Sequence, residues 1–385
     1  MKCIKCGSIY QADPWMFFCP RCGSLLEVTM PPNTSFSWIE ARSRRFGVWR
    51  YIELLPLRNN IEPVTMCEGG TPLVKISRIT QSQGAYVKLE GSNPTGSFKD
   101  RGMTIGLTIA KYIGVEGVVV ASTGNTSASA AAYAARAGLK CVVVLPRGNV
   151  AKGKLAQALL YGAEILEVEG VFDNALERVL TDYVLKQKRN MYPLNSYNPW
   201  RLEGQKTIAF EIVDELGESP DFVIVPVGNA GNISAIWKGF KELYNYGLTS
   251  KLPRMIGVQA EKASPLVATW RSKTPYLIEV DDPSTVATAI KIGKPVNWLK
   301  AIRAVEESKG EFIAVSDNEI LRAMRDLGRY EGVGLEPASA ATLAGYKRAL
   351  EEGIIRKDDV VVLIGTGNVL KDPDAVIAAI NESKT

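Results

Sequence analysis

Apolar and polar positions follow two different patterns along this chain, and the change comes near residue 85. From there on, short and almost continuous apolar runs, rich in valine and isoleucine, alternate with longer amphipathic stretches such as residues 102–110. The short runs predict strands and the longer stretches predict helices. Because strands that are apolar on both sides are covered on both faces, an α/β fold with largely parallel sheets is expected. The predicted strands are residues 86–90, 117–122, 141–145, 164–168, 222–226, 255–259, 312–315 and 360–364.

Residues before 85 are less regular. Residues 1–29 form a separate cysteine-containing segment, and residues 30–63 indicate a linker with one or two helices that pack on a larger body. The stretch 68–73, Glu-Gly-Gly-Thr-Pro-Leu, predicts a turn that leads into short strands. The sequence has no internal repeat of solenoid length, and its length favours more than one lobe.

Composition narrows the possible functions. The 385 residues are 46% hydrophobic and carry a net charge of +5, and no basic run is interleaved with aromatic residues, which argues against nucleic acid as a partner. No apolar stretch reaches the roughly 18 residues of a membrane span. The first residues lack the apolar stretch of a signal peptide. We therefore expect a soluble, cytoplasmic protein that binds neither membrane nor nucleic acid.

Histidine is absent from the sequence. The absence excludes catalysis by Ser-His or Cys-His pairs and any metal site with histidine ligands. Acid–base chemistry must use lysine, carboxylates, tyrosine, cysteine, substrate groups or a cofactor. For an enzyme of this size, the absence favours a cofactor.

Four of the six cysteines form two Cys-x2-Cys pairs, each followed by a glycine. This spacing predicts a structural zinc site of the ribbon type, since four thiolate ligands leave no open coordination position. Disulfides, which a reducing compartment disfavours, and an iron–sulfur centre are the alternatives. Cys67 and Cys141 stand apart and are expected to be small buried hydrophobic residues. The predicted metal ligands are Cys3, Cys6, Cys19 and Cys22.

Lys99 stands in the first turn of a predicted helix, after a strand and a Gly/Pro turn. The positive end of the helix dipole disfavours an ammonium group there, and burial lowers the pKa of a lysine in the same direction. A neutral amine can attack a carbonyl carbon, so Lys99 is a candidate nucleophile. A solvated surface lysine is the alternative.

Predicted strands end in small polar loops at the edge where open parallel sheets bind ligands. After strand 117–122, hydroxyl residues precede an alanine-rich helix and can hold a carboxylate, and Asn125 can donate to a phenolate oxygen. After strand 222–226, the glycine-rich loop 228–232 lets the backbone approach a phosphate, although it matches neither the Walker nor the dinucleotide pattern. A capped helix and a tight turn are the respective alternatives.

Two further positions complete a set of cofactor-binding groups. Thr366, at a strand end, can hydrogen-bond a heterocyclic nitrogen, and Arg201 in the polar stretch 195–201 offers a fork of donors to a phosphate. A helix cap with a surface arginine is the alternative for that stretch. Pyridoxal phosphate is the small cofactor that requires an amine, a phosphate cradle, a phenolate donor and a ring-nitrogen partner. A neutral hydroxyl at the ring nitrogen favours elimination and replacement over transamination.

Five segments of the chain form a recognisable set: 93–101, 122–126, 195–207, 226–232 and 370–373. In these segments the chain closely resembles the threonine synthases, which belong to the tryptophan synthase β-like family, also called fold type II of the pyridoxal phosphate enzymes. The resemblance spans roughly residues 65–375.

The resemblance implies an α/β architecture of two lobes with mostly parallel sheets, preceded by the zinc-ribbon-like segment. The cofactor is expected between the lobes, and the smaller lobe is expected to close on substrate. A homodimer is a family expectation. The predicted domains are a zinc-ribbon-like segment 1–29, a large α/β domain of residues 30–92 and 194–385, and a small α/β domain of residues 93–193.

Roles of individual residues follow from the same resemblance. Lys99 would form the imine with pyridoxal 5'-phosphate and transfer protons after the substrate displaces it. Asn125 would meet the phenolic oxygen of the cofactor and Thr366 its ring nitrogen. The cofactor phosphate would be held by Gly228, Asn229, Ala230, Gly231 and Asn232, the substrate carboxylate by Ser122, Thr123 and Thr126, and the substrate phosphate by Asn195, Ser196 and Arg201.

The implied reaction is γ-elimination of phosphate from O-phospho-L-homoserine and addition of water at the β-carbon, which gives L-threonine. One position departs from the family, because Asn368 stands where a histidine is common. Replacement at the β-carbon of O-phosphoserine, as in a cysteate or cysteine synthase, and a serine/threonine dehydratase are therefore alternatives. A non-catalytic binding protein that keeps the fold is a remote one.

Overall fold

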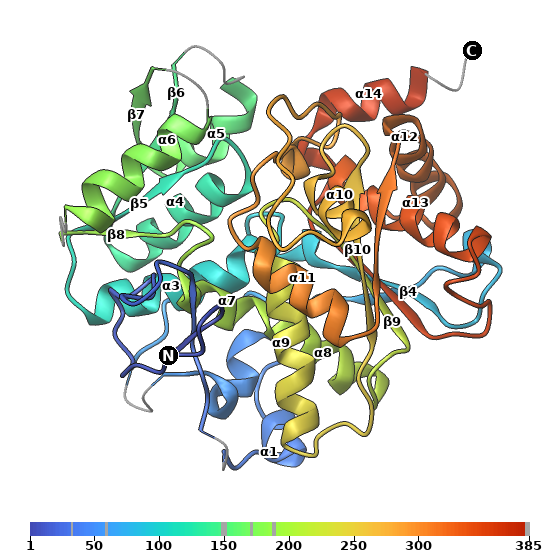
Figure 1. The fold of residues 1–385 in the computed structure, drawn as a ribbon, viewed down its shortest axis with the longest axis horizontal. Helices are drawn as coiled ribbons and strands as arrows, with labels where there is room; N and C mark the ends of the chain where they lie inside the picture. Colours follow the sequence, from blue (N-terminus) through green and yellow to red (C-terminus); the bar gives the residue numbers. More distant parts are fainter. Residues whose placement is uncertain (32–33, 58–60, 148–151, 170–171, 187–189, 382–385) are drawn as a thin grey trace. The chain divides into compact units, whose positions relative to one another are not determined.

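The computed structural model describes residues 1–31, 34–57, 61–147, 152–169, 172–186 and 190–381. The chain divides into two compact units, which Figure 1 shows as ribbons. Unit 1 comprises Met1–Gly69 and Asn93–Gln205, and unit 2 comprises Gly70–Ser92 and Lys206–Thr385. The predicted division into domains 1–29, 30–92 with 194–385, and 93–193 concerns folding domains, which this grouping does not test, and it stays a prediction.

Unit 1 begins with the cysteine-containing segment. Strands β1 (Lys2–Cys3) and β2 (Leu26–Glu27) form a small antiparallel sheet. Helix α1 (Trp38–Arg42) and a 3₁₀ helix (Val48–Leu54) follow, so the expected short helices in residues 30–63 are present.

The main sheet of unit 1 is parallel, with strand order β7-β6-β5-β8. Helix α6 packs on β5 and β6, where Val119 and Val144 belong to the same apolar cluster. Val118 and Val120 point to the other face of β5 and are also fully buried, so both faces are covered as the valine-rich pattern predicts. The elements are β5 (Gly117–Ala121), β6 (Lys140–Pro146), β7 (Glu164–Val168), β8 (Met191–Pro193), α3 (Lys99–Tyr112), α4 (Asn125–Ala137), α5 (Lys152–Leu160), α6 (Phe172–Val179), a π-helical turn (Leu180–Leu185) and α7 (Pro199–Gln205).

Unit 2 contains a six-stranded sheet of order β11-β10-β9-β12-β4-β3, in which β3 alone is antiparallel to its neighbour. Helix α13 packs against β9, β10, β11 and β12. The strands are β3 (Leu73–Lys75), β4 (Ala85–Leu89), β9 (Phe222–Pro226), β10 (Arg254–Ala260), β11 (Glu311–Val315) and β12 (Val361–Gly365). The α-helices are α2 (Ser77–Thr80), α8 (Thr207–Leu216), α9 (Gly231–Asn245), α10 (Pro265–Ser272), α11 (Trp298–Glu307), α12 (Asp317–Asp326), α13 (Pro337–Glu351) and α14 (Pro373–Asn381).

The sequence pattern predicts the long strands within two residues of their observed ends. It gives no separate strand at β8, because three residues are too few to show a period. The 3₁₀ and π turns of unit 2 were also not predicted; they are Glu90–Ser92, Thr288–Ile290, Val369–Lys371 and Leu327–Glu331.

Helices α3 and α7 of unit 1 cross at close range because three glycines lie at their contact. A Cβ atom on Gly204 would stand 1.7 Å from the carbonyl oxygen of Arg101, and one on Gly102 would stand 3.0 Å from that of Arg201. Gly106 leaves room for the Cγ atom of Arg201 on the same face. The crossing therefore fixes α7 and its arginine beside the helix that begins at Lys99.

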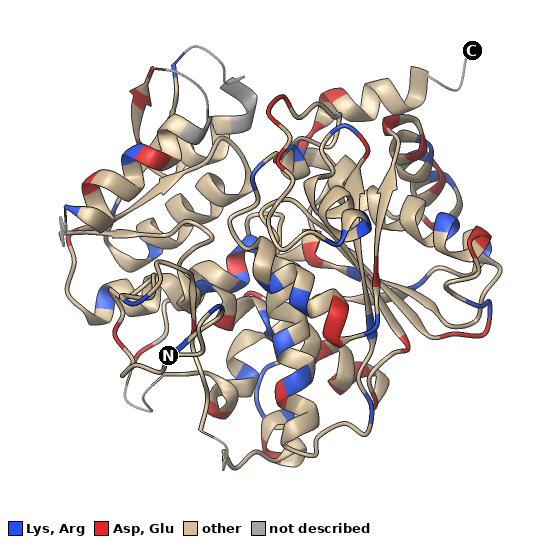
Figure 2. Ribbon diagram, in the orientation of Figure 1, with Lys and Arg blue, Asp and Glu red and all other residues tan. Residues whose placement is uncertain are grey.

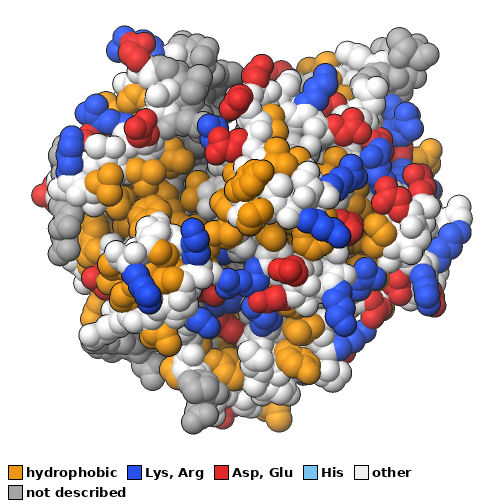
Figure 3. Space-filling view, in the orientation of Figure 1, with side chains coloured by type: hydrophobic (Ala, Val, Ile, Leu, Met, Phe, Trp, Pro, Cys, Tyr) orange, Lys and Arg blue, Asp and Glu red, His pale blue; other side chains and the backbone are white. Residues whose placement is uncertain are grey.

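Charges of both signs are interspersed along both units (Figure 2), and hydrophobic side chains reach the visible surface in patches between them (Figure 3). Among the described residues, no helix combines the length and the hydropathy that crossing a membrane requires.

Candidate active site

Lys99 is the first residue of α3, as the sequence predicts. Its Nζ atom lies 4.2 Å from the centre of the Phe98 ring. The side chain is partly exposed, whereas Phe98 and Asp100 on either side are buried. Ser97, just before the helix, is fully buried, and its hydroxyl has no hydrogen-bond partner within the described part of the chain. The start of α3 thus presents an amine and an unsatisfied hydroxyl.

Asp100 fixes the start of α3 against its surroundings. Its carboxylate accepts hydrogen bonds from the backbone N–H of Thr95 at 2.7 Å, from the Thr95 hydroxyl at 2.6 Å and from the Ser129 hydroxyl of α4 at 2.5 Å. The pKa of Asp100 is raised to about 6. Burial is the main cause and the charge of Glu68 adds to it, while the hydrogen bonds from Ser129 and Thr95 act in the opposite direction. Sequence reasoning missed this residue because nothing in the pattern pairs Asp100 with Ser129.

Glu68 is a second buried carboxylate in unit 1 that the sequence analysis did not assign. It accepts hydrogen bonds from the hydroxyl of Tyr133 at 2.7 Å and from the backbone N–H of Met66 at 3.0 Å. Burial, together with the charges of Asp100 and Glu68, raises the pKa of Tyr133 far above its usual range. Tyr133 therefore stays a neutral donor, and the pair ties the turn before β3 to α4.

The prediction that Cys67, in the same turn, is buried was wrong. Its side chain is exposed and its φ angle is 65°, in the left-handed region, although a buried residue was expected. The reason is local, because the amide of Met66 donates to Glu68 and the amide of Cys67 donates to the Thr65 hydroxyl, which turns the backbone outward. Cys141 is buried on β6, as expected.

The loop between β5 and α4 carries the predicted carboxylate-binding residues. Ser122, Thr123, Asn125 and Thr126 are all partly exposed, and α4 begins at Asn125 without a side-chain cap. The Ser122 hydroxyl accepts from the backbone N–H of Gly124 at 3.2 Å. The helix start and its hydroxyl residues therefore form a group of donors for an anion.

Asn195 and Ser196 follow β8 within unit 1. The side-chain amide of Asn195 is paired with Ala121 at the end of β5: its Nδ2 atom donates to the carbonyl oxygen and its Oδ1 atom accepts from the N–H, both at 2.9 Å. Asn195 therefore holds the strand end that precedes Ser122. Ser196 is partly exposed, while Asn195 is buried.

Arg201 of α7 is a buried cation with few partners. Its Nη1 atom donates to the carbonyl oxygen of Leu194 at 2.6 Å, and its buried Nε atom has no hydrogen-bond partner among the described residues. Burial lowers the pKa of Arg201 to about 10. The hydroxyl of Tyr197 and the Nε1 atom of Trp200 are also buried, and neither has a hydrogen-bond partner in the part of the chain that the structure describes. An anion would satisfy these donors and supply the missing counter-charge.

Unit 2 carries the glycine-rich loop at the end of β9. Ala230 has a φ angle of 64°, which is unusual for a residue with a Cβ atom, and α9 begins at Gly231 without a side-chain cap. A Cβ atom on Gly228 would stand 3.0 Å from the carbonyl oxygen of Ala289. Asn232 is 7% exposed, and neither its amide nitrogen nor its oxygen has a partner within the described residues. The loop therefore combines an uncapped helix start with a buried amide that has no partner among the described residues, which are features of a phosphate site.

Thr366 follows β12 and is buried in unit 2. Its Oγ1 atom lies 2.8 Å from the hydroxyl of Ser339 and donates to a carboxylate oxygen of Glu336 at 3.5 Å. Ser339 also accepts from the backbone N–H of Gly367 at 2.8 Å. Glu336 and Ser339 stand at the start of α13, and sequence reasoning missed them because an ordinary Pro-initiated helix gives no indication of this contact.

Asn368, the position that departs from the family pattern, caps a turn. Its Oδ1 atom accepts from the backbone N–H of Leu370 at 3.0 Å, at the start of the 3₁₀ helix Val369–Lys371. The Asn368 side chain therefore caps the 3₁₀ helix that follows it in the chain.

The four cysteines of the N-terminal segment lie together. Their Sγ atoms are all within 4.8 Å of one another, with 3.4 Å between Cys3 and Cys22 and 3.7 Å between Cys6 and Cys19. A tetrahedron with metal–sulfur distances of about 2.3 Å has sulfur–sulfur distances of about 3.8 Å. The six cysteines are free thiols, so the cluster can bind a metal.

The described residues fit pyridoxal phosphate in each unit taken separately. Unit 1 supplies the Lys99 amine and a buried, unsatisfied Ser97 hydroxyl. Unit 2 supplies a backbone cradle that would be tight for a Cβ atom at Gly228, a buried Asn232 amide without partners among the described residues, and the hydroxyl of Thr366. These are the donor types that a phosphate, a phenolate and a ring nitrogen need.

Known proteins match this chain along most of its length. The model of the family described as pyridoxal-phosphate dependent enzyme matches residues 64–367. A threonine synthase of Methanocaldococcus jannaschii is 53% identical over 388 residues, which cover 99% of this chain and 95% of that protein. A threonine synthase of Methanosarcina acetivorans is 49% identical, over 99% of this chain and 94% of its own length.

Solved structures share the fold at lower identity. The crystal structure of threonine synthase from Escherichia coli has a TM-score of 0.71 and 21% identity, and covers 95% of this chain and 86% of its own. A fungal L-serine ammonia-lyase from Rhizomucor miehei has a TM-score of 0.68 and 19% identity, over 83% and 99% of the two chains. This likeness confirms the predicted α/β fold with mostly parallel sheets.

Proposed function

Because the chain belongs to the threonine synthase family of pyridoxal-phosphate dependent enzymes, we propose that it converts O-phospho-L-homoserine and water to L-threonine and phosphate. The resemblance predicted from the sequence is thereby confirmed at the level of the family. The single observation that carries the choice of a phosphorylated substrate is the buried, incompletely partnered guanidinium of Arg201.

Lys99 holds the cofactor through its Nζ atom in this proposal, and the same amine then takes up and returns protons at the substrate. Pyridoxal phosphate supplies an electron sink, which lets the bonds next to the substrate nitrogen break. Asn125 donates to the phenolic oxygen, and the loop 228–232 holds the phosphate of the cofactor. Thr366, kept in place by Ser339, faces the ring nitrogen.

The substrate is held at its two ends. Ser122, Thr123 and Thr126 bind its carboxylate at the uncapped start of α4. Ser196 and Arg201 bind its phosphate. Asn195, which follows β8 and pairs with the Ala121 backbone at the end of β5, is the third residue that we assign to this phosphate. The donors around Arg201 are the strongest support, because a buried cation that meets one backbone carbonyl costs stability unless an anion joins it.

The test replaces Arg201 by methionine, which keeps the volume and removes the charge and the donors. We expect kcat/KM for O-phospho-L-homoserine to fall at least about 100-fold, since hydrogen bonds between charged groups are worth about 1.5–3 kcal/mol each. Deamination of L-serine, which carries no phosphate, should change less than about threefold.

The matched control is Arg136→Met, an exposed arginine on α4 of the same unit. It should leave both activities unchanged. Equal loss of both activities in Arg201→Met would contradict the proposed role of Arg201. Phosphate release from O-phosphoserine but not from O-phospho-L-homoserine by the unaltered enzyme would favour β-replacement, and deamination alone would favour a dehydratase.

We also propose that the four-cysteine cluster holds structural zinc, since four thiolates at tetrahedral spacing suit this metal and leave no position for substrate. Metal analysis of the purified protein should find one zinc per chain, and Cys22→Ser should lose it. An iron–sulfur centre would instead give the protein visible absorption without added cofactor.

A cytoplasmic homodimer completes the proposal. The six free cysteines support a reducing compartment. Light scattering of the purified protein measures the mass directly, and a value of one 42.0 kDa chain would exclude the dimer.

A further inference from the structure

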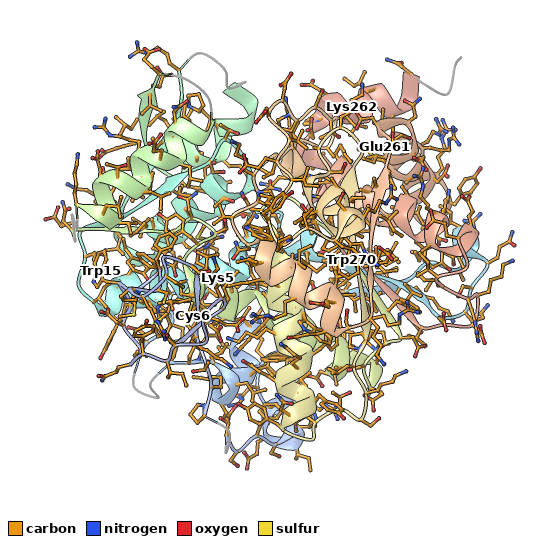
Figure 4. The ribbon with its side chains drawn as sticks, in the orientation of Figure 1. Lys5, Cys6, Trp15, Glu261, Lys262 and Trp270 are labelled. Atoms are coloured by element: carbon orange, nitrogen blue, oxygen red, sulfur yellow. The ribbon has the colours of Figure 1, made fainter. Side chains whose placement is uncertain are left out.

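The N-terminal cysteine segment touches the polar stretch that we assign to the substrate phosphate. Residues 14–18 lie between the two cysteine pairs and pack against β8 and the residues after it, all within unit 1. Figure 4 labels Cys6 and Trp15 in this segment. The segment is thus in contact with the site, and the contact is made by aromatic rings.

The rings of Phe17 and Phe18 in the segment both contact the ring of Tyr197. The centres of the Phe17 and Tyr197 rings are 5.7 Å apart at an interplanar angle of 65°, and those of Phe18 and Tyr197 are 5.6 Å apart at 31°. Tyr197 is 1% exposed, so these contacts are dry. Aromatic pairs of this geometry stabilise a contact beyond the area that they bury.

A second contact anchors the segment on β8. The hydroxyl of Tyr192 donates to the carbonyl oxygen of Pro14 at 3.0 Å, and the ring of Trp15 meets that of Tyr192 edge-on at 5.3 Å. Strand β2, which closes the segment, also lies against α7. The segment therefore contacts both ends of the stretch that runs from β8 to α7.

Tyr197 lies directly after Asn195 and Ser196 and four residues before Arg201. The carbonyl oxygen of Leu194, next to this pair, accepts from the Arg201 guanidinium. Moving Tyr197 therefore moves the backbone that carries all three residues assigned to the substrate phosphate.

The metal site fixes Phe17 and Phe18 through the chain. Cys19 follows Phe18 directly, and the amide of Leu26 donates to the carbonyl oxygen of Phe17 at 3.1 Å. The sheet of β1 and β2 pairs only four residues, and single backbone bridges join Lys2 to Ile9 and Phe18 to Leu25. A metal bound by all four cysteines would add a covalent constraint to this small framework.

We infer that the metal-loaded cysteine segment is a positioning device for substrate: through Phe17 and Phe18 it sets Tyr197 and thereby the phosphate-binding stretch 195–201. Phe18 is a positioning residue that acts through Tyr197 and does not touch the substrate. The inference rests on the proposed function, and it assigns the metal an effect on substrate affinity and none on cofactor binding.

The test compares the holoenzyme with Phe18→Leu, which keeps all four cysteines, and with Cys22→Ser, which removes an exposed ligand. Four quantities are measured: metal content, cofactor absorbance, KM and kcat for O-phospho-L-homoserine, and the Kd of inorganic phosphate by calorimetry. Phe36→Leu is the control, because Phe36 also sits in an aromatic cluster of unit 1 but contacts Trp38 and Tyr51.

We expect KM and the phosphate Kd to rise together, about three- to tenfold in Phe18→Leu and at least about tenfold in Cys22→Ser, as the loss of one or two aromatic contacts requires. kcat and cofactor absorbance should stay within about twofold, Phe18→Leu should keep its metal, and Phe36→Leu should match the unaltered enzyme.

An unchanged KM and phosphate Kd in Cys22→Ser that has lost its metal would overturn the inference. A parallel loss of kcat, cofactor and substrate affinity would overturn it too, because the segment would then only stabilise the fold. If the unaltered holoenzyme fails to turn over O-phospho-L-homoserine, the proposed function fails, and the phosphate Kd still tests the coupling by itself.

Discussion

Two strand-to-helix loops of this protein can be compared directly, the one from β5 to α4 in unit 1 and the one from β9 to α9 in unit 2. Each follows a fully buried parallel strand and opens a helix without a side-chain cap. The first has partly exposed hydroxyl residues at 122, 123 and 126. The second is almost wholly buried and consists of backbone around Ala230 in the left-handed conformation.

The difference shows how one local structure serves two kinds of ligand. Backbone amides in a loop without spare volume hold a group of fixed shape, such as a phosphate that stays bound. Hydroxyl side chains at an open helix start can adapt to a group that enters and leaves in every turnover. We therefore assign the cofactor phosphate to the loop of unit 2 and the substrate carboxylate to that of unit 1.

Among substitutions in the two loops, the largest effect is expected when the tight loop is filled. In Gly228→Ala the new Cβ atom would stand 3.0 Å from the Ala289 carbonyl oxygen and 3.1 Å from the Ile290 Cα atom, both backbone atoms. We expect the Kd of pyridoxal phosphate to rise about 10- to 100-fold, as overpacking costs about 1–3 kcal/mol. Titration of the apoenzyme with cofactor, followed by absorbance, measures it.

The counterpart is Gly124→Ala in the open loop, where an added Cβ atom meets nothing within 4 Å. Its cofactor Kd should change less than about threefold. Equal effects of the two substitutions would remove the distinction between the loops.

A smaller effect is expected from Asn232→Ala. The buried amide has no partner among the described residues, so its donors are available to the cofactor phosphate. Losing one hydrogen bond to a charged group costs about 1.5–3 kcal/mol, and we expect the cofactor Kd to rise at least about tenfold with KM for substrate unchanged. If the amide were merely structural, stability would fall while the cofactor Kd stayed the same.

Ser122→Ala should act on the substrate instead. Removing this hydroxyl from the start of α4 takes away one neutral donor, and its bond to the Gly124 amide, so KM should rise about fivefold. Cofactor absorbance should be unaltered. A change in the cofactor band without a change in KM would reverse the assignment of the two loops.

The smallest expected effect is a change of KM with pH, which we attribute to Asp100 of unit 1. Asp100, whose pKa is raised to about 6, holds Ser129 of α4 and Thr95 only while it can accept all three of their hydrogen bonds. Below about pH 6 the protonated group loses an acceptor, so KM should rise a few-fold there, and Asp100→Asn should flatten this limb. The cofactor Kd should not follow the same titration.

The contribution of Asp100 to the free energy of unfolding should change with pH in the opposite direction to its contribution to substrate binding. A carboxyl group whose pKa is higher in the folded than in the unfolded chain stabilises the fold below the unfolded value and loses this contribution as pH rises through about 6. Denaturant unfolding between pH 4 and pH 7, compared with Asp100→Asn, measures the difference, and a stability that rises with pH only in the unaltered protein would contradict the assignment.

Site residues could be predicted from the sequence where the residues that form a site lie close together in the chain. Lys99 opens its helix, and the loop 228–232 leads into α9, because strand, glycine turn and helix start leave a local pattern. The four cysteines come together because their spacing alone defines a ribbon.

Partners that only the fold brings together could not be predicted from the sequence. Asp100 with Ser129, Glu68 with Tyr133, and Thr366 with Ser339 are separated by 27 to 65 residues, so no local pattern links them. The double pairing of Asn195 with Ala121 has the same origin, since only the adjacency of β5 and β8 creates it.

In the proposed function, Lys99 holds the cofactor with which this chain acts as a threonine synthase. The most direct measurement adds O-phospho-L-homoserine to the purified holoenzyme and to Lys99→Ala, and follows phosphate and L-threonine in the same sample. We predict equal amounts of both products from the unaltered enzyme, and a loss of at least about 10³-fold together with the cofactor band in Lys99→Ala. Phosphate without threonine, or full activity in the variant, would contradict the claim.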